Sequence, residues 1–228
     1  IDWKQSGRHG KLVAREFRTE RNHHVILAID TGRLMCGPTP AGPRVDQAIN
    51  AALLLAFAGL KLGDRVGLIA FDARPRVSSG VVSGAAAFPL IQRLAASIDY
   101  STEETNFTLG LTTLAGRLDR RALVVVFTDF ADPTSAELMI ENVGRLMRKH
   151  LVLFVVFHDD ELEALAEAEP TEPDDVSRAV IAAGLLRQRE IVVSRLERLG
   201  ARLVDARAED LGLSLLDAYL DAKRRELI

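Results

Sequence analysis

Four short runs of almost entirely apolar residues, rich in β-branched side chains, are the strongest constraint on the fold of this chain. They are HVILAI (24–29), RVGLIAF (65–71), ALVVVF (122–127) and LVLFVVF (151–157). Each has the length of a strand, and a strand that lacks a polar face is buried on both sides. Stretches of helical character separate the runs. The pattern therefore predicts a mostly parallel sheet with helices on both faces.

The segments between these runs complete a doubly wound α/β domain. We expect an antiparallel edge strand in RPRVSS (74–79), joined to the second strand by a hairpin, and a sixth strand in ARLVDA (201–206). Helices are expected over the ranges 45–62, 85–97, 108–118, 135–149, 176–199 and 210–227. The domain is assigned to 24–228, after a basic lead-in over 1–23 that is expected to pack on it.

Composition excludes several classes of protein. The net charge of −3 gives no basic field for nucleic acid. The single cysteine, Cys36, excludes an internal disulfide framework and fits a reducing compartment. The longest apolar run, 51–60, is too short to span a bilayer. The chain begins with Ile1 rather than methionine, so we expect it to be a fragment of a longer protein.

Two aspartates follow strands that we expect to be neighbours. Asp30 ends the first run, and Asp129 closely follows the run at 122–127. Ligands bind such sheets beyond the carboxyl ends of the strands, where the strand order reverses. If the two strands are adjacent, about 4.8 Å apart, both carboxylates share one crevice, and Thr105 can reach it from the preceding loop. The alternatives are that the aspartates only stabilise turns and that Thr105 only caps a helix.

Enzyme motifs are absent from the places where they would be needed. No glycine-rich dinucleotide turn follows the first strand, and there is neither a phosphate-binding P-loop nor a nucleophile elbow. Gly32 stands where an aspartyl phosphatase needs its second aspartate. His158 is only a weak candidate for a general base. We therefore predict no catalytic residue, with a magnesium-dependent hydrolase that uses Asp30 and Asp129 as the alternative.

Segments spread along the chain resemble a known bacterial family. DWKQSGRHGKLVAREF, INAALLLA, GDRVGLIAF, ETNFTLGL and VVVFTDFAD are similar to the family called domain of unknown function fifty-eight, whose members have a von Willebrand factor A-like domain. The resemblance covers nearly the whole chain. It implies a six-stranded Rossmann-like sheet of order 3-2-1-4-5-6 in which strand 3 is antiparallel.

The resemblance also implies a metal-ion-dependent adhesion site. Asp30, Thr105 and Asp129 match its three motifs, but Gly32 and Leu34 replace the two serines of the first motif. Magnesium needs six oxygens, so we expect a degenerate site that binds magnesium or manganese weakly.

The residues next to this site are candidates for partner docking. They are Thr31, Gly32, Arg33 and Asp132. By strand alternation, Thr31 faces away from the site. The guanidinium of Arg33 either takes the place of the metal beside the aspartates or, as the favoured interpretation, faces solvent.

Members of the family are associated with MoxR-type AAA ATPases and often carry membrane-spanning helices ahead of this region. The resemblance thus implies a non-enzymatic protein-interaction domain at the cytoplasmic face of the inner membrane, acting in complex assembly or in a chaperone-like role. A further alternative places partner docking on the acidic 159–175 segment, which includes Glu161, Glu163 and Glu167 and has no basic residue.

Overall fold

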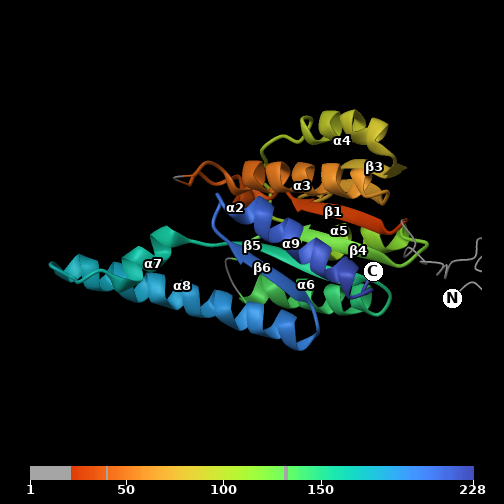
Figure 1. Cartoon of the computed structure of the whole chain (residues 1–228). Helices are drawn as coiled ribbons and strands as arrows, with labels where there is room; N and C mark the ends of the chain where they lie inside the picture. The colour runs from red at the N-terminus through yellow and green to blue at the C-terminus, as the bar shows by residue number, and fades with distance from the viewer. Residues whose placement is uncertain (1–21, 40, 131–132) are drawn as a thin grey trace, which may run out of the picture.

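A six-stranded sheet of order β3-β2-β1-β4-β5-β6 forms the centre of the domain in the computed structural model, which describes residues 22–39, 41–130 and 133–228 (Figure 1). Its strands are β1 (His24–Asp30), β2 (Arg65–Phe71), β3 (Pro75–Ser83), β4 (Ala122–Phe127), β5 (Leu151–Phe157) and β6 (Arg202–Ala206). Among the strands of the described residues, only the pairing of β2 with β3 is antiparallel. The predicted fold class, strand order and antiparallel edge strand are confirmed.

Helices connect the strands and cover the sheet. They are α2 (Arg33–Cys36), α3 (Arg44–Lys61), the 3-10 turn η1 (Ala85–Ala87), α4 (Phe88–Ala95), α5 (Phe107–Gly116), α6 (Pro133–Met147), α7 (Asp160–Glu167), α8 (Pro173–Arg198) and α9 (Leu211–Arg224). The short α2 was not predicted. Among the described helices, none combines the length and the apolar content needed to span a membrane. Residues 1–21 of the predicted lead-in lie outside the described residues, so its assignment stays a prediction.

Alternate residues of the strands supply two separate cores. In β1, Val25, Leu27 and Ile29 pack toward α3, α4 and α9, whereas Ile26 and Ala28 pack toward α5, α6 and α8. Because successive side chains of a strand point to opposite faces, an apolar run without polar positions serves both cores at once. This is why the four apolar runs predicted the inner strands correctly.

Local sequence moves some boundaries from their predicted places. The α5 helix is capped by Asn106, whose side chain accepts a hydrogen bond from the amide of Leu109, so the suggestion that Thr105 is the cap was wrong. The α8 helix begins at Pro173 rather than Val176, because Glu172 and Asp175 form a capping box and proline fits the first helical position.

The carboxyl ends of β1, β4 and β5 lie at one edge of the sheet. Since β1 pairs with β2 on one side and β4 on the other, the strand order reverses here. The N-terminus of α3 reaches the same edge, where Arg44 at its start pairs with Asp129 and Asp159. The predicted neighbourhood of Asp30 and Asp129 is therefore confirmed at the level of the fold.

Candidate functional site

Asp30 is a buried carboxylate held by neutral donors. Its Oδ1 accepts hydrogen bonds from the Gly32 amide at 2.8 Å and from the Thr105 hydroxyl at 2.6 Å. Its Oδ2 accepts one from the Thr128 hydroxyl at 2.7 Å. Burial raises the pKa of Asp30 to about 6, with a further contribution from the negative charge of Asp129, although the three hydrogen bonds act in the opposite direction.

The hydroxyl of Thr105 occupies the space beside Gly32. A Cβ atom built on Gly32 would lie 2.0 Å from Thr105 Oγ1 and 3.2 Å from Asp30 Oδ1. A serine, which the adhesion-site motif has at this position, would therefore force Thr105 to turn away and lose its hydrogen bond to Asp30. Glycine at this position thus follows from the packing of the loop around Thr105.

Asp129 has an arginine as its partner. Arg44 at the start of α3 places Nη1 3.2 Å from Asp129 Oδ2 and Nη2 2.5 Å from Asp159 Oδ2. The other oxygen of Asp129 accepts a hydrogen bond from the Phe130 amide at 2.8 Å. The side chains of Arg44 and Asp159 are each 17% exposed and that of Asp129 is 11% exposed, so the pairs are partly shielded from water.

The other predicted docking residues are divided between buried and exposed positions. Arg33 is solvent-facing, with a side chain 63% exposed and Nη2 2.5 Å from Glu104 Oε1, which agrees with the favoured interpretation. Thr31 and Gly32 are buried and offer little surface to a partner. Asp132 lies outside the described residues. The cation beside the aspartates is thus Arg44, which the sequence analysis missed.

The oxygens of this site do not form a fitting set of ligands for a divalent cation. Both oxygens of Asp30 already accept hydrogen bonds, Thr105 directs its hydroxyl proton at Asp30, and Asp129 is engaged by Arg44. Magnesium requires an octahedral shell at about 2.1 Å, and Gly32 and Leu34 supply no hydroxyl to it. A metal ion here would have to displace the guanidinium and rotate Thr105.

His158, the weak candidate base, belongs to a separate cluster at the ends of β5 and β6. Its Nε2 lies 3.0 Å from Glu163 Oε2 and 3.5 Å from Asp160 Oδ1, and its Nδ1 lies 3.6 Å from Asp205 Oδ1. Both ring nitrogens therefore face carboxylates of α7 and β6. Asp160 also pairs with Arg207 at 2.8 Å. This arrangement gives the hydrolase alternative no base directed at Asp30.

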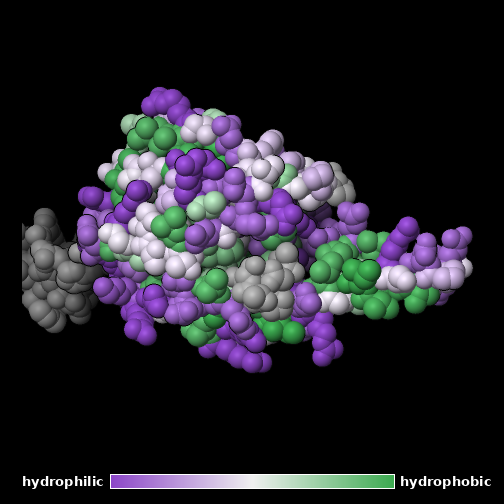
Figure 2. All heavy atoms as spheres, turned by 180° about the vertical axis from the view of Figure 1, so that it is seen from behind, coloured by the Kyte–Doolittle hydropathy of each residue, from purple (hydrophilic) through white to green (hydrophobic). Residues whose placement is uncertain are grey.

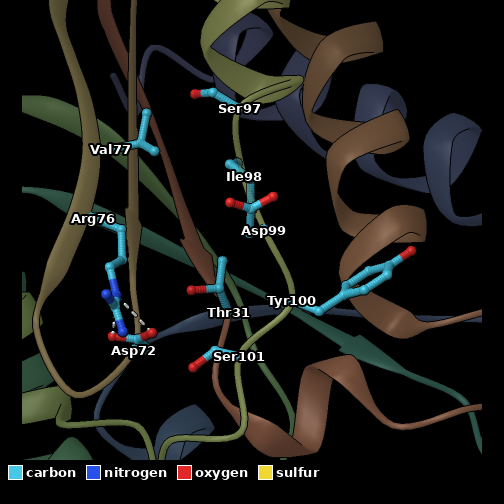
Figure 3. Close-up of a pocket in the computed structure, with 9 residues that line it drawn as sticks. All are labelled: Thr31, Asp72, Arg76, Val77, Ser97, Ile98, Asp99, Tyr100 and Ser101. Atoms are coloured by element: carbon cyan, nitrogen blue, oxygen red, sulfur yellow. Dashed lines mark hydrogen bonds and ion pairs between the residues drawn. The ribbon is translucent and has the colours of Figure 1, made fainter.

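A cavity of about 310 Å³ lies beside the ends of β1 and β2, where Thr31 and Asp72 line it (Figure 3). Asp72 binds the Arg76 guanidinium at 2.8 Å and 2.9 Å. Burial acts to raise the pKa of Asp72, but hydrogen bonds from Ser101 and the Arg74 amide, with the charge of Arg76, lower it below its usual range. Asp72 also stabilises the turn after β2, since its Oδ1 accepts a hydrogen bond from the Arg74 amide at 3.1 Å.

The sequence matches a family model described as "Protein of unknown function DUF58" over residues 1–190. The chain belongs to this family. The resemblance inferred from the motifs is therefore confirmed. No curated protein matches the chain.

Solved structures with the same fold as this DUF58 member include von Willebrand factor A-like proteins. The BatB protein of Bacteroides thetaiotaomicron has a TM-score of 0.53 at 11% identity, with 86% of this chain and 98% of that chain covered. The vWF domain of the pilus tip protein Mfa5 of Porphyromonas gingivalis has 0.55 at 10%, with 89% and 95% covered. The pilus adhesin SpaC of Lactobacillus rhamnosus GG has 0.59 at 12%, with 90% and 30% covered. At these identities the likeness shows the fold.

One sequence signal in this DUF58 member could have revealed Arg44. Arg44 is the first residue of α3, directly after Pro43. The N-terminus of a helix carries partial positive charge, so an arginine there is unfavourable unless carboxylates face it. Asp129 and Asp159 are those carboxylates, but they come from the ends of β4 and β5. Asp159 was missed because it was assigned to a solvated acidic segment.

Proposed function

We propose that this domain is a non-enzymatic protein-interaction module that docks its partner at the carboxyl edge of the sheet without a metal ion. The observation that carries the proposal is the guanidinium of Arg44 between Asp129 and Asp159. The guanidinium of Arg44 holds the loops after β4 and β5 together there, as a metal ion holds loops together in a metal-dependent adhesion site. The von Willebrand factor A-like fold and the absence of a positioned base among the described residues support an interaction role over catalysis.

The charge of the edge favours a basic group on the partner. Two carboxylates, Asp129 and Asp159, share the single positive charge of Arg44, and Asp30 adds further negative charge above its pKa of about 6. A metal-bound site attracts an acidic side chain of its partner, because that carboxylate completes the shell of the ion. Here the sign is reversed, and a lysine or arginine of the partner is electrostatically complementary.

The full-length protein is proposed to work with a MoxR-type AAA ATPase at the inner membrane, with this domain on the cytoplasmic face and a membrane segment ahead of it. The support is membership of the DUF58 family together with the interaction-type fold. The role would be complex assembly or chaperone-like action. The ATPase is thus the first partner to test.

The test is binding of the purified MoxR-type ATPase from the same genome, measured by calorimetry in EDTA and in excess magnesium. We expect equal affinity in both buffers and weaker binding by Asp159→Asn, which removes one contact of Arg44. Asp217→Asn, an exposed aspartate of α9, is the matched control. Binding that requires magnesium would exclude the metal-free mode, and no binding in either buffer would exclude this partner.

A thermal melt of the domain checks the metal question without a partner. We expect the same midpoint in EDTA, magnesium and manganese, because the site oxygens are already engaged. A cation at a hundred times its dissociation constant would stabilise the fold by about 2.7 kcal/mol and raise the midpoint by several degrees. Such a rise, lost in Asp129→Ala, would restore the metal-dependent model.

A further inference from the structure

The helix α8 extends well beyond the body of the domain. Its 26 residues correspond to about 39 Å of helix, and Figure 1 shows α7 and the first half of α8 projecting together as an arm. Val192 and Leu196, near the C-terminal end of α8, join the core against the sheet. In the first half of α8, Ala182 is the one buried residue. The arm is thus held mainly by the packing of α7 against the first half of α8.

The middle of α8 is apolar around its whole circumference. Residues 179–186 read AVIAAGLL, and the side chains of Val180 and Ile181 are 67% and 63% exposed. Figure 2 shows an apolar area on the arm from behind. Val176 and Leu185 of α8 are exposed as well, at 48% and 39%. A helix that is apolar on all sides is normally covered, since a solvent-facing helix keeps a polar face. The α7 helix covers only one side.

The two ends of α8 carry opposite charges. The first turn and its cap contain Glu172, Asp174 and Asp175. The last turn contains Arg195 and Arg198 with Glu197 between them, so its net charge is positive, although Arg195 already pairs with Glu137 of α6 at 3.2 Å. A second copy of α8 laid alongside in the same direction would place like charges together. A copy laid in the opposite direction places each acidic end beside a basic end. The helix is therefore complementary to itself in the antiparallel orientation.

We propose that two copies of this chain associate through their arms, with α8 packed antiparallel to α8 about a two-fold axis near Gly184. In this arrangement Ser177 and Val180 of one copy lie opposite the turn around Ile191 of the other, which is 41% exposed. A Cβ on Gly184 would meet nothing within 4 Å in the single chain, so a second helix can approach closely there.

The first test is sedimentation velocity of the whole chain over a range of concentrations. We expect a concentration-dependent dimer, which Val180→Glu converts to a monomer without change in the circular dichroism spectrum. Leu213→Glu is the matched control, because Leu213 is 65% exposed on α9, away from the arm. A wild-type chain that stays monomeric at its highest soluble concentration would overturn the proposal. So would a dimer that survives Val180→Glu and Val176→Glu together.

A cysteine test then fixes the geometry. In a Cys36→Ser background, we expect Gly184→Cys to form an intermolecular disulfide readily, because a residue at the two-fold axis meets its own copy. Ser177→Cys lies seven residues away, so its two copies are about 20 Å apart and should not react. Crosslinking of Ser177→Cys but not Gly184→Cys would show a different interface and overturn the antiparallel model.

Charge reversal separates self-association from membrane binding. Arg198→Glu should weaken the dimer, and Asp174→Lys added to it should restore part of the affinity. The same variants are mixed with vesicles of neutral and anionic lipid. Binding of the arm to vesicles by a chain that never dimerises would assign the apolar surface to a membrane and overturn the proposal.

Discussion

Two buried aspartates lie at opposite ends of the same sheet, and only one of them pairs with a cation. Asp64, at the amino end of β2, accepts a hydrogen bond from the buried Tyr219 hydroxyl and forms an ion pair with Lys223 Nζ at 2.6 Å. Asp30, at the carboxyl end of β1, has two hydroxyls and an amide as hydrogen-bond partners. Among the described residues, no lysine or arginine forms an ion pair with it. One carboxylate is neutralised and the other is not.

The difference separates a structural end of the domain from the end that we propose to bind a partner. Lys223 and Tyr219 come from α9, so their contacts with Asp64 attach the last helix to the start of β2 at that edge of the sheet. At the other edge, Asp129 and Asp159 share the single positive charge of Arg44, so negative charge is in excess there. A buried charge without a cation is unfavourable for folding. Its presence at the strand-order reversal suits a site that acts on a partner.

The largest expected effect is loss of the Asp64 charge. Asp64→Ala leaves Lys223 and Tyr219 without their buried acceptor and should lower the free energy of unfolding by about 3–5 kcal/mol, measured by urea titration. Asp217→Ala on the exposed face of α9 should change it by less than about 0.5 kcal/mol. A loss below about 1 kcal/mol for Asp64→Ala would remove the contrast between the two ends.

Asp30→Asn should act in the opposite direction. Because the pKa of Asp30 is about 6 in the folded chain against 3.8 when unfolded, the folded state binds the proton more tightly. This contribution to stability is fully present below pH 3.8 and is lost as the pH rises through about 6, a difference of about 3 kcal/mol. At pH 7 the asparagine variant should thus be more stable than wild type, by up to that amount.

The measurement for Asp30 is the difference in urea stability between wild type and Asp30→Asn from pH 4 to pH 8. We expect the advantage of the variant to grow between pH 4 and pH 6 and then to level off. An advantage that shrinks over this window would mean that Asp30 is neutralised in the folded chain, as Asp64 is.

Arg44→Gln tests the shared cation. The glutamine leaves Asp129 and Asp159 without a positive neighbour, and we expect a loss of about 1–3 kcal/mol in urea. We also expect a magnesium-dependent rise of the melting temperature that wild type lacks, since the carboxylates are released. Arg93→Gln on the exposed surface of α4, away from the arm, is the control. A variant as stable as wild type would show that the guanidinium does not hold the edge together.

Arg33→Ala should have the smallest effect. Its pair with Glu104 is exposed on both sides, 63% and 70%, so loss of the pair should change the free energy of unfolding by about 0.5 kcal/mol or less. Partner binding is the more informative measurement. A large loss of ATPase binding in Arg33→Ala, with Arg44→Gln unaffected, would move the docking site outward to the exposed loop.

The sequence predicted the strand ends that carry the site better than the partners of the site's side chains. Asp30 and Asp129 were predicted to meet because each follows an apolar strand, and parallel strands end at the same edge. Thr128, which donates to Asp30, was missed because it looked like the end of a strand. Arg33 was suggested as a cation only because it is near in sequence. Arg44 lies 85 residues from Asp129 along the chain, and no local pattern joins them.

What the sequence determined by itself is therefore the layered fold, through apolar runs that must be buried on both faces and the helical stretches between them. Which polar groups meet was decided only by tertiary structure. The ion pairs of Arg44 depend on how α3 lies over the ends of β4 and β5, and glycine at position 32 depends on the Thr105 hydroxyl beside it. Burial is recorded in local periodicity, whereas a polar contact depends on side-chain positions set by segments distant in the chain.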